Sequence, residues 1–407
     1  MSGNGGANGR EVASQDHSHP PPVGALVIGG DYQGLGIVRS LGRQGVPVGV
    51  LDDELSIARF SRYATFAERV PSLKDGETTI RLLLELHEKR GLSGWVLYPT
   101  RDETVAALSL HRDKLCTLYR VPTPCSQTIQ WLWDKRKTYE LASQLGIPAP
   151  RTWRIKELKD LDQIEGHFPV ALKPAIKEHF IYVTRAKAWR ANNLAQLRTL
   201  FNSALQFMPA DEILIQDLIP GNGRCQYAYC ALFKDGKPVA SLVTRRLRQH
   251  PLEFGRASTY VESLELPCLE KFSEAFLRAA NYYGLVEIEY KYDQRDREYK
   301  LLDANARSWG YNSIGQAAGV DFPFLLYSDQ IGEPVSSIRG KPGVRWVRLL
   351  TDLPTGAMAI LKSEVTGRDY IRSLIDVNEE AVFSRQDPLP SLVECALAPY
   401  LFLKRGY

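Results

Sequence analysis

Acidic side chains gather in one short stretch of this 407-residue chain, between Gly284 and Gly310. The stretch contains two runs of alternating apolar and polar residues, VEIEYKY and YKLLDAN, joined by the charged turn QRDRE. Such alternation predicts a pair of strands, and pairing brings Glu289 towards Asp303 and Asn305. Two carboxylates and an amide oxygen are hard donors of the kind that bind Mg²⁺ together with a nucleotide's phosphates. The alternative is an ordinary hairpin whose charges face solvent.

Two lysines upstream could meet such phosphates. The apolar run from Phe168 to Leu172 predicts a short buried strand, and Lys173 stands at its end before a proline. Lys187 begins a second strand-like piece. The segment AIKEHFIYVTRAKAW that joins them contains no glycine, so the backbone N–H groups of a flexible glycine-rich lid are not expected there. NLAQLRTLFNSAL, which follows, predicts an amphipathic helix packed on this small sheet.

A helix and a hinge frame these lysines. DKRKTYELASQL predicts a charged amphipathic helix with Asp134 as its N-cap and Gly146 at its end. EILIQDLIPGNG predicts an apolar strand that runs into a turn, with Gln216, Asp217 and Ile219 at the junction. A nucleotide base could be bound there by backbone groups, which places few demands on the side chains.

In this order, the lysine, hinge and acid motifs resemble those of the ATP-grasp superfamily over roughly residues 24–329. The last segment resembles the carboxylate–amine ligase branch, which is related to D-aspartate ligase-like and carbamoyl-phosphate-synthase-like proteins. The resemblance implies that ATP is bound by Lys173, Lys187, Gln216, the Asp217 carbonyl and the Ile219 amide. It also implies that Mg²⁺, or Mn²⁺ as the alternative ion, is bound by Glu289, Asp303 and Asn305.

The resemblance further implies a cation near the transferred phosphate or the substrate carboxylate. A hairpin with Asp235-Gly236 as its turn carries a basic cluster, and each member could equally be part of a solvated basic strand. The cluster consists of Arg245, Arg246, Arg248 and His250. Arg246 is the first catalytic candidate. Arg307, which directly follows the predicted metal ligands, is the second, because a planar guanidinium suits the oxyanion of an acyl phosphate.

These elements predict an α/β protein with an α+β catalytic part. An N-terminal parallel-sheet domain is expected to precede a two-lobed ATP-grasp domain that clamps the nucleotide. The expected divisions are a disordered tail at 1–22, a Rossmann-like domain at 23–130, the ATP-grasp domain at 131–330 with a small lid subdomain at about 165–215, and a C-terminal extension at 331–407.

The N-terminal domain opens with a βαβ pattern that could be mistaken for a dinucleotide site. VGALVIGG and VPVGVLDD predict strands, DYQGLG a turn, IVRSLGRQG a helix, and residues 57–70 a connecting segment. An NAD-dependent enzyme using Gly34 and Gly36, with Asp52 or Asp53 on a ribose, is therefore an alternative. The glycines do not follow G-x-G-x-x-G, which makes the dinucleotide signal weak. The domain is instead expected to wall the acceptor-substrate cleft with residues 100–103 at the carboxyl end of a strand.

Composition excludes several classes of partner. The formal net charge is +4, without a long basic tract, which argues against nucleic acid but allows a local basic cleft for phosphates. The six cysteines show no metal-ligand spacing and are expected to be reduced thiols of a cytoplasmic protein. No apolar run reaches the roughly 18 residues of a membrane span, and residues 1–22 lack the apolar core of a signal peptide.

The function that follows from the resemblance is an ATP-dependent ligation. A substrate carboxylate is converted to an acyl phosphate, which an amine then attacks to give an amide, with ADP and phosphate as the other products. The expected partners are small amino-acid-like carboxylates and amines, and a homodimer is possible in the family. The alternative is an ATP-binding regulator or degenerate paralogue without ligase activity, which the glycine-free lid segment favours.

Overall fold

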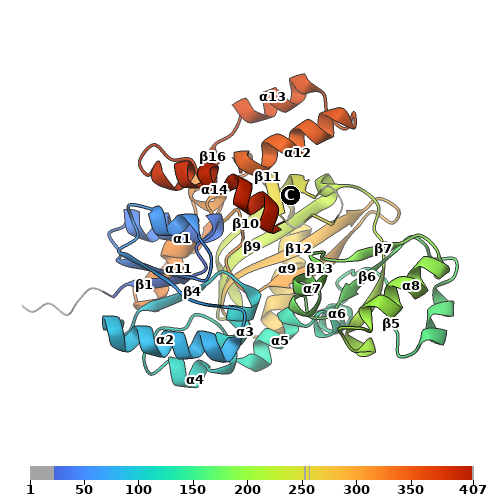
Figure 1. Cartoon of the computed structure of the whole chain (residues 1–407), viewed down its shortest axis with the longest axis horizontal. Helices are drawn as coiled ribbons and strands as arrows, with labels where there is room; N and C mark the ends of the chain where they lie inside the picture. Colours follow the sequence, from blue (N-terminus) through green and yellow to red (C-terminus); the bar gives the residue numbers. More distant parts are fainter. Residues whose placement is uncertain (1–22, 252–253, 256, 406–407) are drawn as a thin grey trace, which may run out of the picture.

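The computed structural model describes residues 23–251, 254–255 and 257–405, and it contains three β-sheets (Figure 1). The tail predicted at residues 1–22 lies outside the described residues. The N-terminal sheet and its helices form one side of the molecule, and a small sheet with its own helices forms the opposite side, with a large sheet between them (Figure 1). No helix among the described residues is long and apolar enough to cross a membrane.

The first sheet is parallel, with strand order β3-β2-β1-β4. Strands β1, β2 and β4 are buried along their whole length, as expected for parallel strands covered on both faces. The strands are β1 (Ala25–Ile28), β2 (Val48–Asp52), β3 (Phe66–Arg69) and β4 (Val96–Pro99). The helical elements are α1 (Tyr32–Arg43), η1 (Ile57–Phe60), α2 (Gly76–Arg90), α3 (Asp102–Leu110) and α4 (Arg112–Leu115).

Two predictions for this domain were wrong. The segment DYQGLG is not a turn, because Asp31 caps α1 by accepting a hydrogen bond from the backbone N–H of Tyr32, and the helix begins there. The Asp31 carboxylate satisfies a free helical N–H group, and this local signal outweighed the two glycines. Residues 57–70 are more than a connection, since they contain η1 and the edge strand β3.

Two helices lead from this domain to the small antiparallel sheet. They are α5 (Ser126–Trp133) and α6 (Lys135–Gln144), and Asp134 caps α6 as predicted by accepting from Arg136 N–H at 2.9 Å. The small sheet has the order β5-β8-β6-β7 and consists of β5 (Thr152–Arg154), β6 (Val170–Pro174), β7 (Trp189–Ala191) and β8 (Ile213–Asp217). Helices α7 (Glu178–Thr184) and α8 (Leu194–Ala204), with short turns η2 (Leu158–Ile164) and η3 (Ala210–Glu212), complete this subdomain.

The large sheet follows the order β13-β12-β9-β10-β11-β15-β16, and β14 pairs with β10. Its strands are β9 (Gln226–Lys234), β10 (Lys237–His250), β11 (Ala257–Leu264), β12 (Gly284–Asp293), β13 (Glu298–Asn305), β14 (Ile338–Arg339), β15 (Arg345–Val347) and β16 (Glu379–Glu380). The associated helical elements are η4 (Gly223–Cys225), α9 (Pro267–Ala279), α10 (Ile314–Ala317) and α11 (Phe322–Gln330). Both predicted hairpins are present, β9–β10 around Asp235-Gly236 and β12–β13 around residues 294–297.

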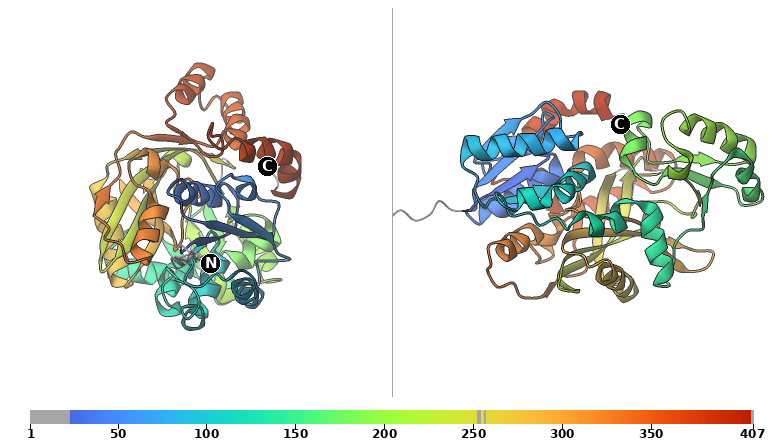
Figure 2. Two further views of the ribbon diagram at one scale, coloured as in Figure 1. Left: turned by 90° about the vertical axis from the view of Figure 1, so that its left-hand side faces the viewer. Right: turned by 90° about the horizontal axis from the view of Figure 1, so that it is seen from below.

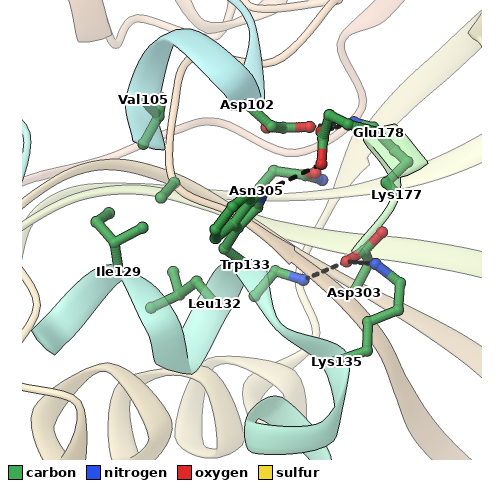
Figure 3. Close-up of a pocket in the computed structure, with 12 residues that line it drawn as sticks. Asp102, Val105, Ile129, Leu132, Trp133, Lys135, Lys177, Glu178, Asp303 and Asn305 are labelled. Atoms are coloured by element: carbon green, nitrogen blue, oxygen red, sulfur yellow. Dashed lines mark hydrogen bonds and ion pairs between the residues drawn. The ribbon is translucent and has the colours of Figure 1, made fainter. Parts of the chain in front are cut away.

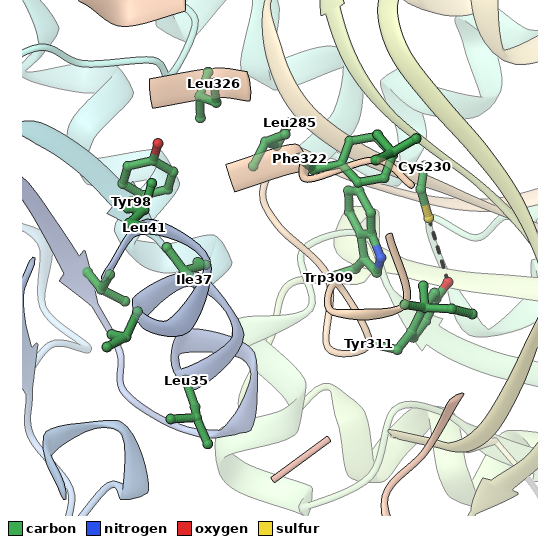
Figure 4. Packing of buried hydrophobic residues seen from close by; sticks show 14 of the residues in the cluster. Leu35, Ile37, Leu41, Tyr98, Cys230, Leu285, Trp309, Tyr311, Phe322 and Leu326 are labelled. Atoms are coloured by element: carbon green, nitrogen blue, oxygen red, sulfur yellow. Dashed lines mark hydrogen bonds between the residues drawn. The ribbon is translucent and has the colours of Figure 1, made fainter. Parts of the chain in front are cut away.

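One hydrophobic core joins the first sheet to the large one. Leu35 and Ile37 of α1 belong to the same cluster as Cys230 of β9 and Trp309 and Phe322 beyond β13 (Figure 4). The Trp309 and Phe322 rings meet edge to face with centroids 4.9 Å apart. Because the two sheets share a buried core, the carboxyl end of β4 is held firmly against the end of β13.

The C-terminal segment folds back over the first domain. It contains α12 (Leu349–Leu361), α13 (Gly367–Ile375) and α14 (Leu389–Arg405), and α12 and α13 project from the body (Figures 1 and 2). Asp387, which is 1% exposed, accepts hydrogen bonds from Arg39 Nε at 2.9 Å and Ser61 Oγ at 2.7 Å. This buried ion pair fixes the segment before α14 to α1 and to the residue after η1.

Candidate active site

A cavity of about 760 Å³ lies between the small sheet and the large sheet. Its walls come from β6, the segment before β7, the end of β8, β10, and the β12–β13 hairpin. Nine Lys and Arg side chains line it against four Asp and Glu side chains. The modest net charge of the whole chain thus conceals a basic cleft, which suits a polyphosphate.

The cleft brings together most of the predicted site residues, which come from four separate segments of the chain. The predicted residues that line it are Lys173, Lys187, Gln216, Asp217, Ile219, Arg246, Glu289 and Asp303. Asn305 and Arg307 do not line it. Asn305 faces a smaller neighbouring cavity, and the Arg307 guanidinium is turned towards α3.

The acid pair lies as the alternation predicted. Glu289 on β12 is directly opposite Asp303 on β13, next to an irregularity in the strand register. Lys135 Nζ donates to Asp303 Oδ1 at 2.7 Å, and Arg246 Nη2 lies 3.6 Å from Glu289 Oε1. Burial of Asp303 disfavours its charge, but the ammonium groups of Lys135, Lys177 and Lys173 together outweigh burial and hold the pKa of this carboxyl below its usual value. Asp303 is therefore ionised at neutral pH.

The donor set of this hairpin fits Mg²⁺ through two carboxylates. Magnesium sites on nucleotides commonly use one or two protein carboxylates and leave other positions to phosphate oxygens and water. Among the described residues, no three His, Cys, Asp or Glu side chains are arranged to hold a metal by themselves. The amide oxygen of Asn305 accepts from Arg307 Nη2 at 3.4 Å, and its Nδ2 donates to Glu287 Oε2 at 3.1 Å. Its role as a third ligand stays a prediction.

A third carboxylate supports the hairpin from behind. Glu287 is buried on the same face as Glu289 and accepts a hydrogen bond from the Tyr311 hydroxyl at 2.5 Å. Burial, followed by repulsion from Glu289, raises the pKa of Glu287 to about 7. Glu287 thus carries a proton for part of the time at neutral pH, which lowers the repulsion on this face.

The predicted nucleotide lysines occupy different environments. Lys173 Nζ donates to the Tyr139 hydroxyl at 2.5 Å, and it lies 5.0 Å from the centroid of that ring. Lys187 lies between α7 and β7, and its pKa is lowered by burial and by the nearby charges of Arg246 and Lys177. An added anion in the cleft would reverse that shift.

The hinge is held by contacts that the sequence did not predict. Lys291 of β12 donates to the carbonyl oxygens of Ile219 at 2.8 Å and Gly221 at 2.9 Å. Arg295 pairs with the Asp217 carboxylate at 2.6 Å. These bonds fix the backbone after β8, where the adenine-binding groups were predicted. The alternation along β12 could have placed Lys291 at the cleft, because it puts Lys291 on the same face of the strand as Glu289.

Among the basic cluster on β10, Arg246 is the member directed to the cleft. Arg245 pairs with Glu262 of the neighbouring strand, and Arg248 pairs with Asp352 of α12 at 2.8 Å. Arg246 lines the cleft and approaches Glu289. The other two arginines thus have structural partners, which agrees with the choice of Arg246 for testing.

The glycine-free segment between Lys173 and Lys187 forms a helix, α7, and it is bonded to the first domain. Asp102 at the start of α3 accepts from Lys177, which precedes α7 (Figure 3). It also accepts from Arg307 Nε at 2.6 Å. Tyr182 of α7 donates its hydroxyl to Glu103 at 2.5 Å. Sequence reasoning placed Asp102 and Glu103 at the wall of the acceptor cleft but missed these bonds, because the partners are 75 or more residues away in the chain.

The dinucleotide alternative has no support in the first domain. Arg101 pairs with Asp52 at 2.7 Å and with Asp53 at 2.8 Å, so both acids proposed for a ribose already have a cationic partner. A Cβ at Gly34 would lie 2.2 Å from the Gly29 carbonyl oxygen. Gly34 therefore allows α1 to approach the segment that precedes this helix, and this close approach explains the glycine without a bound pyrophosphate.

The comparisons with known proteins agree with this architecture. No protein-family model matches the chain. The chain is 25% identical over 327 residues to a D-aspartate ligase from Enterococcus faecium, which covers 75% of this chain and 76% of that protein. It is 23% identical over 222 residues to the C-terminal section of a carbamoyl phosphate synthase large chain from Methanopyrus kandleri, covering 52% of this chain and 40% of that one.

Solved structures share the fold at low sequence identity. An L-amino acid ligase from Bacillus licheniformis superposes with a TM-score of 0.60 and 14% identity, covering 77% of this chain and 75% of that chain. The biotin carboxylase domain of a Hydrogenobacter thermophilus 2-oxoglutarate carboxylase, solved with MgADP and bicarbonate, gives a TM-score of 0.63 at 14% identity, covering 79% and 73%. The chain therefore shares the ATP-grasp fold and is similar in sequence to a D-aspartate ligase, which agrees with the resemblance that its motifs predicted.

Proposed function

We propose that this protein is a carboxylate–amine ligase that joins an amino-acid-like carboxylate to an amine at the expense of ATP. The observation that carries the proposal is the single cleft that holds Lys173, Lys187, the hinge after β8 and the Glu289–Asp303 pair together. The names of the relatives, D-aspartate ligase and L-amino acid ligase, support substrates of the amino-acid class.

Within this proposal each part of the cleft has one task. Backbone groups of Asp217 and Ile219, with Gln216 beside them, would bind the adenine edge, and the two lysines would neutralise the phosphates. Glu289 and Asp303, with Asn305 as a predicted third ligand, would hold Mg²⁺, which supplies charge neutralisation at the phosphates when bound. Mn²⁺ is the alternative ion.

The reaction needs no protein nucleophile. The substrate carboxylate would take the γ-phosphoryl group to become an acyl phosphate, and attack by the amine would then form the amide and release phosphate. Arg246 at the cleft wall and Arg307 behind the hairpin would stabilise the negative charge that develops. Positioning and fixed charges supply most of the rate in such transfers.

The test is a phosphate-release screen over pairs of amino acids with ATP and Mg²⁺, followed by comparison of Asp303→Asn with Asp296→Asn. Asp296 is an acid of the same hairpin that lies at its turn and pairs with Lys300, outside the cleft. We expect Asp303→Asn to abolish release and Asp296→Asn to leave it unchanged. Near-normal release by Asp303→Asn with its true substrates would contradict the metal assignment.

A second candidate is an ATP-binding regulator without ligase activity. Helix α7 favours it, because a helix offers few free backbone N–H groups to a triphosphate. Calorimetric titration with ATP and Mg²⁺ separates the two candidates. Binding of ATP without phosphate release for any substrate pair would favour the regulator. A cytoplasmic location and a homodimer remain predictions for either candidate.

A further inference from the structure

A second, much smaller cavity adjoins the cleft. It lies between α3, α5, the start of α7 and the end of β13, and its free volume is about 20 Å³ (Figure 3). This is room for one group the size of a water molecule or an ammonium ion. Lys135, Lys177 and Asp303 line both cavities, so the small one opens beside the predicted position of the transferred phosphate.

One carboxylate oxygen in this cavity lacks a hydrogen bond. Glu178 is 9% exposed, and its Oε2 accepts from Trp133 Nε1 at 3.1 Å. Its Oε1 is buried and has no hydrogen-bond partner among the described residues, and Lys177 Nζ lies 4.0 Å away. A buried carboxylate oxygen without a donor carries a desolvation penalty that a bound donor would relieve.

The other charged groups around Glu178 have partners. Asp102 accepts from both Lys177 and Arg307, and Asp303 accepts from Lys135. Glu178 Oε1 is therefore the acceptor left over in a cavity whose polar side carries three carboxylates against the two ammonium groups of Lys135 and Lys177. The opposite wall is apolar and consists of Val105, Ile129 and Leu132. A single small cationic N–H donor fits the polar side of this cavity.

We propose that Glu178 forms the subsite for the ammonium end of a primary amine, or for ammonium itself, as the second substrate. The inference rests on the proposed ligase function and identifies where its amine binds. The cavity volume admits a single –NH₃⁺ group and excludes tertiary and quaternary amines. The carbon next to the nitrogen would extend out of the small cavity towards the adjoining cleft.

Glu178 can also take the proton that the amine must lose. Burial, followed by the negative charge of Asp102, raises the pKa of Glu178, while Lys177 opposes this shift and Glu103 adds to it. The carboxylate accepts one proton from R–NH₃⁺, and the nitrogen lone pair then attacks the acyl carbon. The C–N bond forms, the C–O bond to phosphate breaks with its electron pair going to phosphate, and the second proton from nitrogen leaves with HPO₄²⁻.

The kinetic test uses ammonium chloride and hydroxylamine as nucleophiles with the carboxylate identified in the release screen. We expect Glu178→Gln to raise the KM for ammonium at least tenfold, and to raise it far more than the KM for ATP. Glu212→Gln is the matched control, because Glu212 lies in the same subdomain, pairs with His179 at 2.6 Å and lines neither cavity. An unchanged KM for ammonium in Glu178→Gln would overturn the proposal.

A binding test keeps this proposal separable from the ligase function. Thermal unfolding of the wild-type protein is measured in ammonium chloride and in tetramethylammonium chloride at equal concentration. Ammonium chloride should raise the thermal unfolding midpoint of the wild type more than tetramethylammonium chloride does. The midpoint of Glu178→Gln should respond equally to the two salts. Equal responses of the wild type would overturn the subsite. A selective response without any turnover would instead refute the ligase function and leave the subsite intact. If Glu178→Gln does not fold, Glu178→Asp, which withdraws the carboxylate by one methylene, replaces it in both tests.

Discussion

Replacing Asp102 with Asn should release helix α7 from the first domain. In the wild type the Asp102 carboxylate bonds both Arg307 and Lys177, and its pKa is far below the usual value because these two cations outweigh the effect of burial. Asparagine keeps the shape but leaves two cations facing a neutral amide. At an effective dielectric constant of 20, two such charges roughly 6 Å apart repel by about 3 kcal/mol. Removing one partner of a buried pair costs about 3–5 kcal/mol in other proteins.

The cost should appear as local opening, because α7 can move away while Arg307, which directly follows β13, stays next to the large sheet. Hydrogen exchange measures this directly at the amides of Phe180 and Ile181, which donate to the Lys177 carbonyl. A loss of about 3 kcal/mol in opening free energy raises their exchange rates by about a hundredfold. The Leu197 amide in α8 of the same subdomain should exchange at an unchanged rate. Unchanged exchange at α7 would refute the idea that Asp102 holds it.

Two further variants test the fold. Gly36→Ala should lower the free energy of unfolding by about 1–3 kcal/mol despite the better helix propensity of Ala, because the new Cβ would lie 2.2 Å from Asn312 Oδ1. The control in urea titrations is Gly367→Ala, whose new Cβ would have nothing within 4 Å. Equal unfolding midpoints for the two variants would contradict the packing argument. Burial raises the pKa of Glu379 to about 7 from 4.5, so the wild type should lose on the order of 1–3 kcal/mol as pH rises from 4.5 to 7. Glu379→Gln should lack this loss when unfolding is measured at pH 5 and pH 8, and parallel pH curves for the two proteins would exclude Glu379 as the cause.

The parts of the site that depend on local pattern could be predicted from the sequence. Period-2 alternation placed Glu289 opposite Asp303, and capping residues placed the start of α6. The hinge and Lys173 were located by apolar runs that end in a turn or a proline. These predictions succeed because strand faces and helix ends are determined by neighbouring residues in the chain.

The parts that depend on distant contacts could not be predicted. Nothing near Lys177 in the sequence indicates that it meets Asp102, and nothing near Arg307 indicates that it does so as well. The same applies to Lys291 and the hinge carbonyls. Such pairs arise only when the three sheets and their helices are assembled, since the partners belong to segments that different sheets position. Polar contacts between segments of different sheets are thus the part of the site that cannot be predicted from a single sequence.

The absence of glycine before Lys187 now has a physical reading. A glycine-rich loop binds phosphate through backbone N–H groups, which have fixed geometry and no net charge. Here that segment is a helix, and the cleft carries nine cationic side chains against four acidic ones. We therefore expect side-chain charges, and not backbone dipoles, to bind the phosphates in the proposed function. Because Lys177 also pairs with Asp102, a helix in this position can bind the first domain and face the phosphates at once. Under the proposed function, closure over the nucleotide and alignment of the acceptor wall are therefore expected to be coupled, which a flexible loop without such a partner would not achieve.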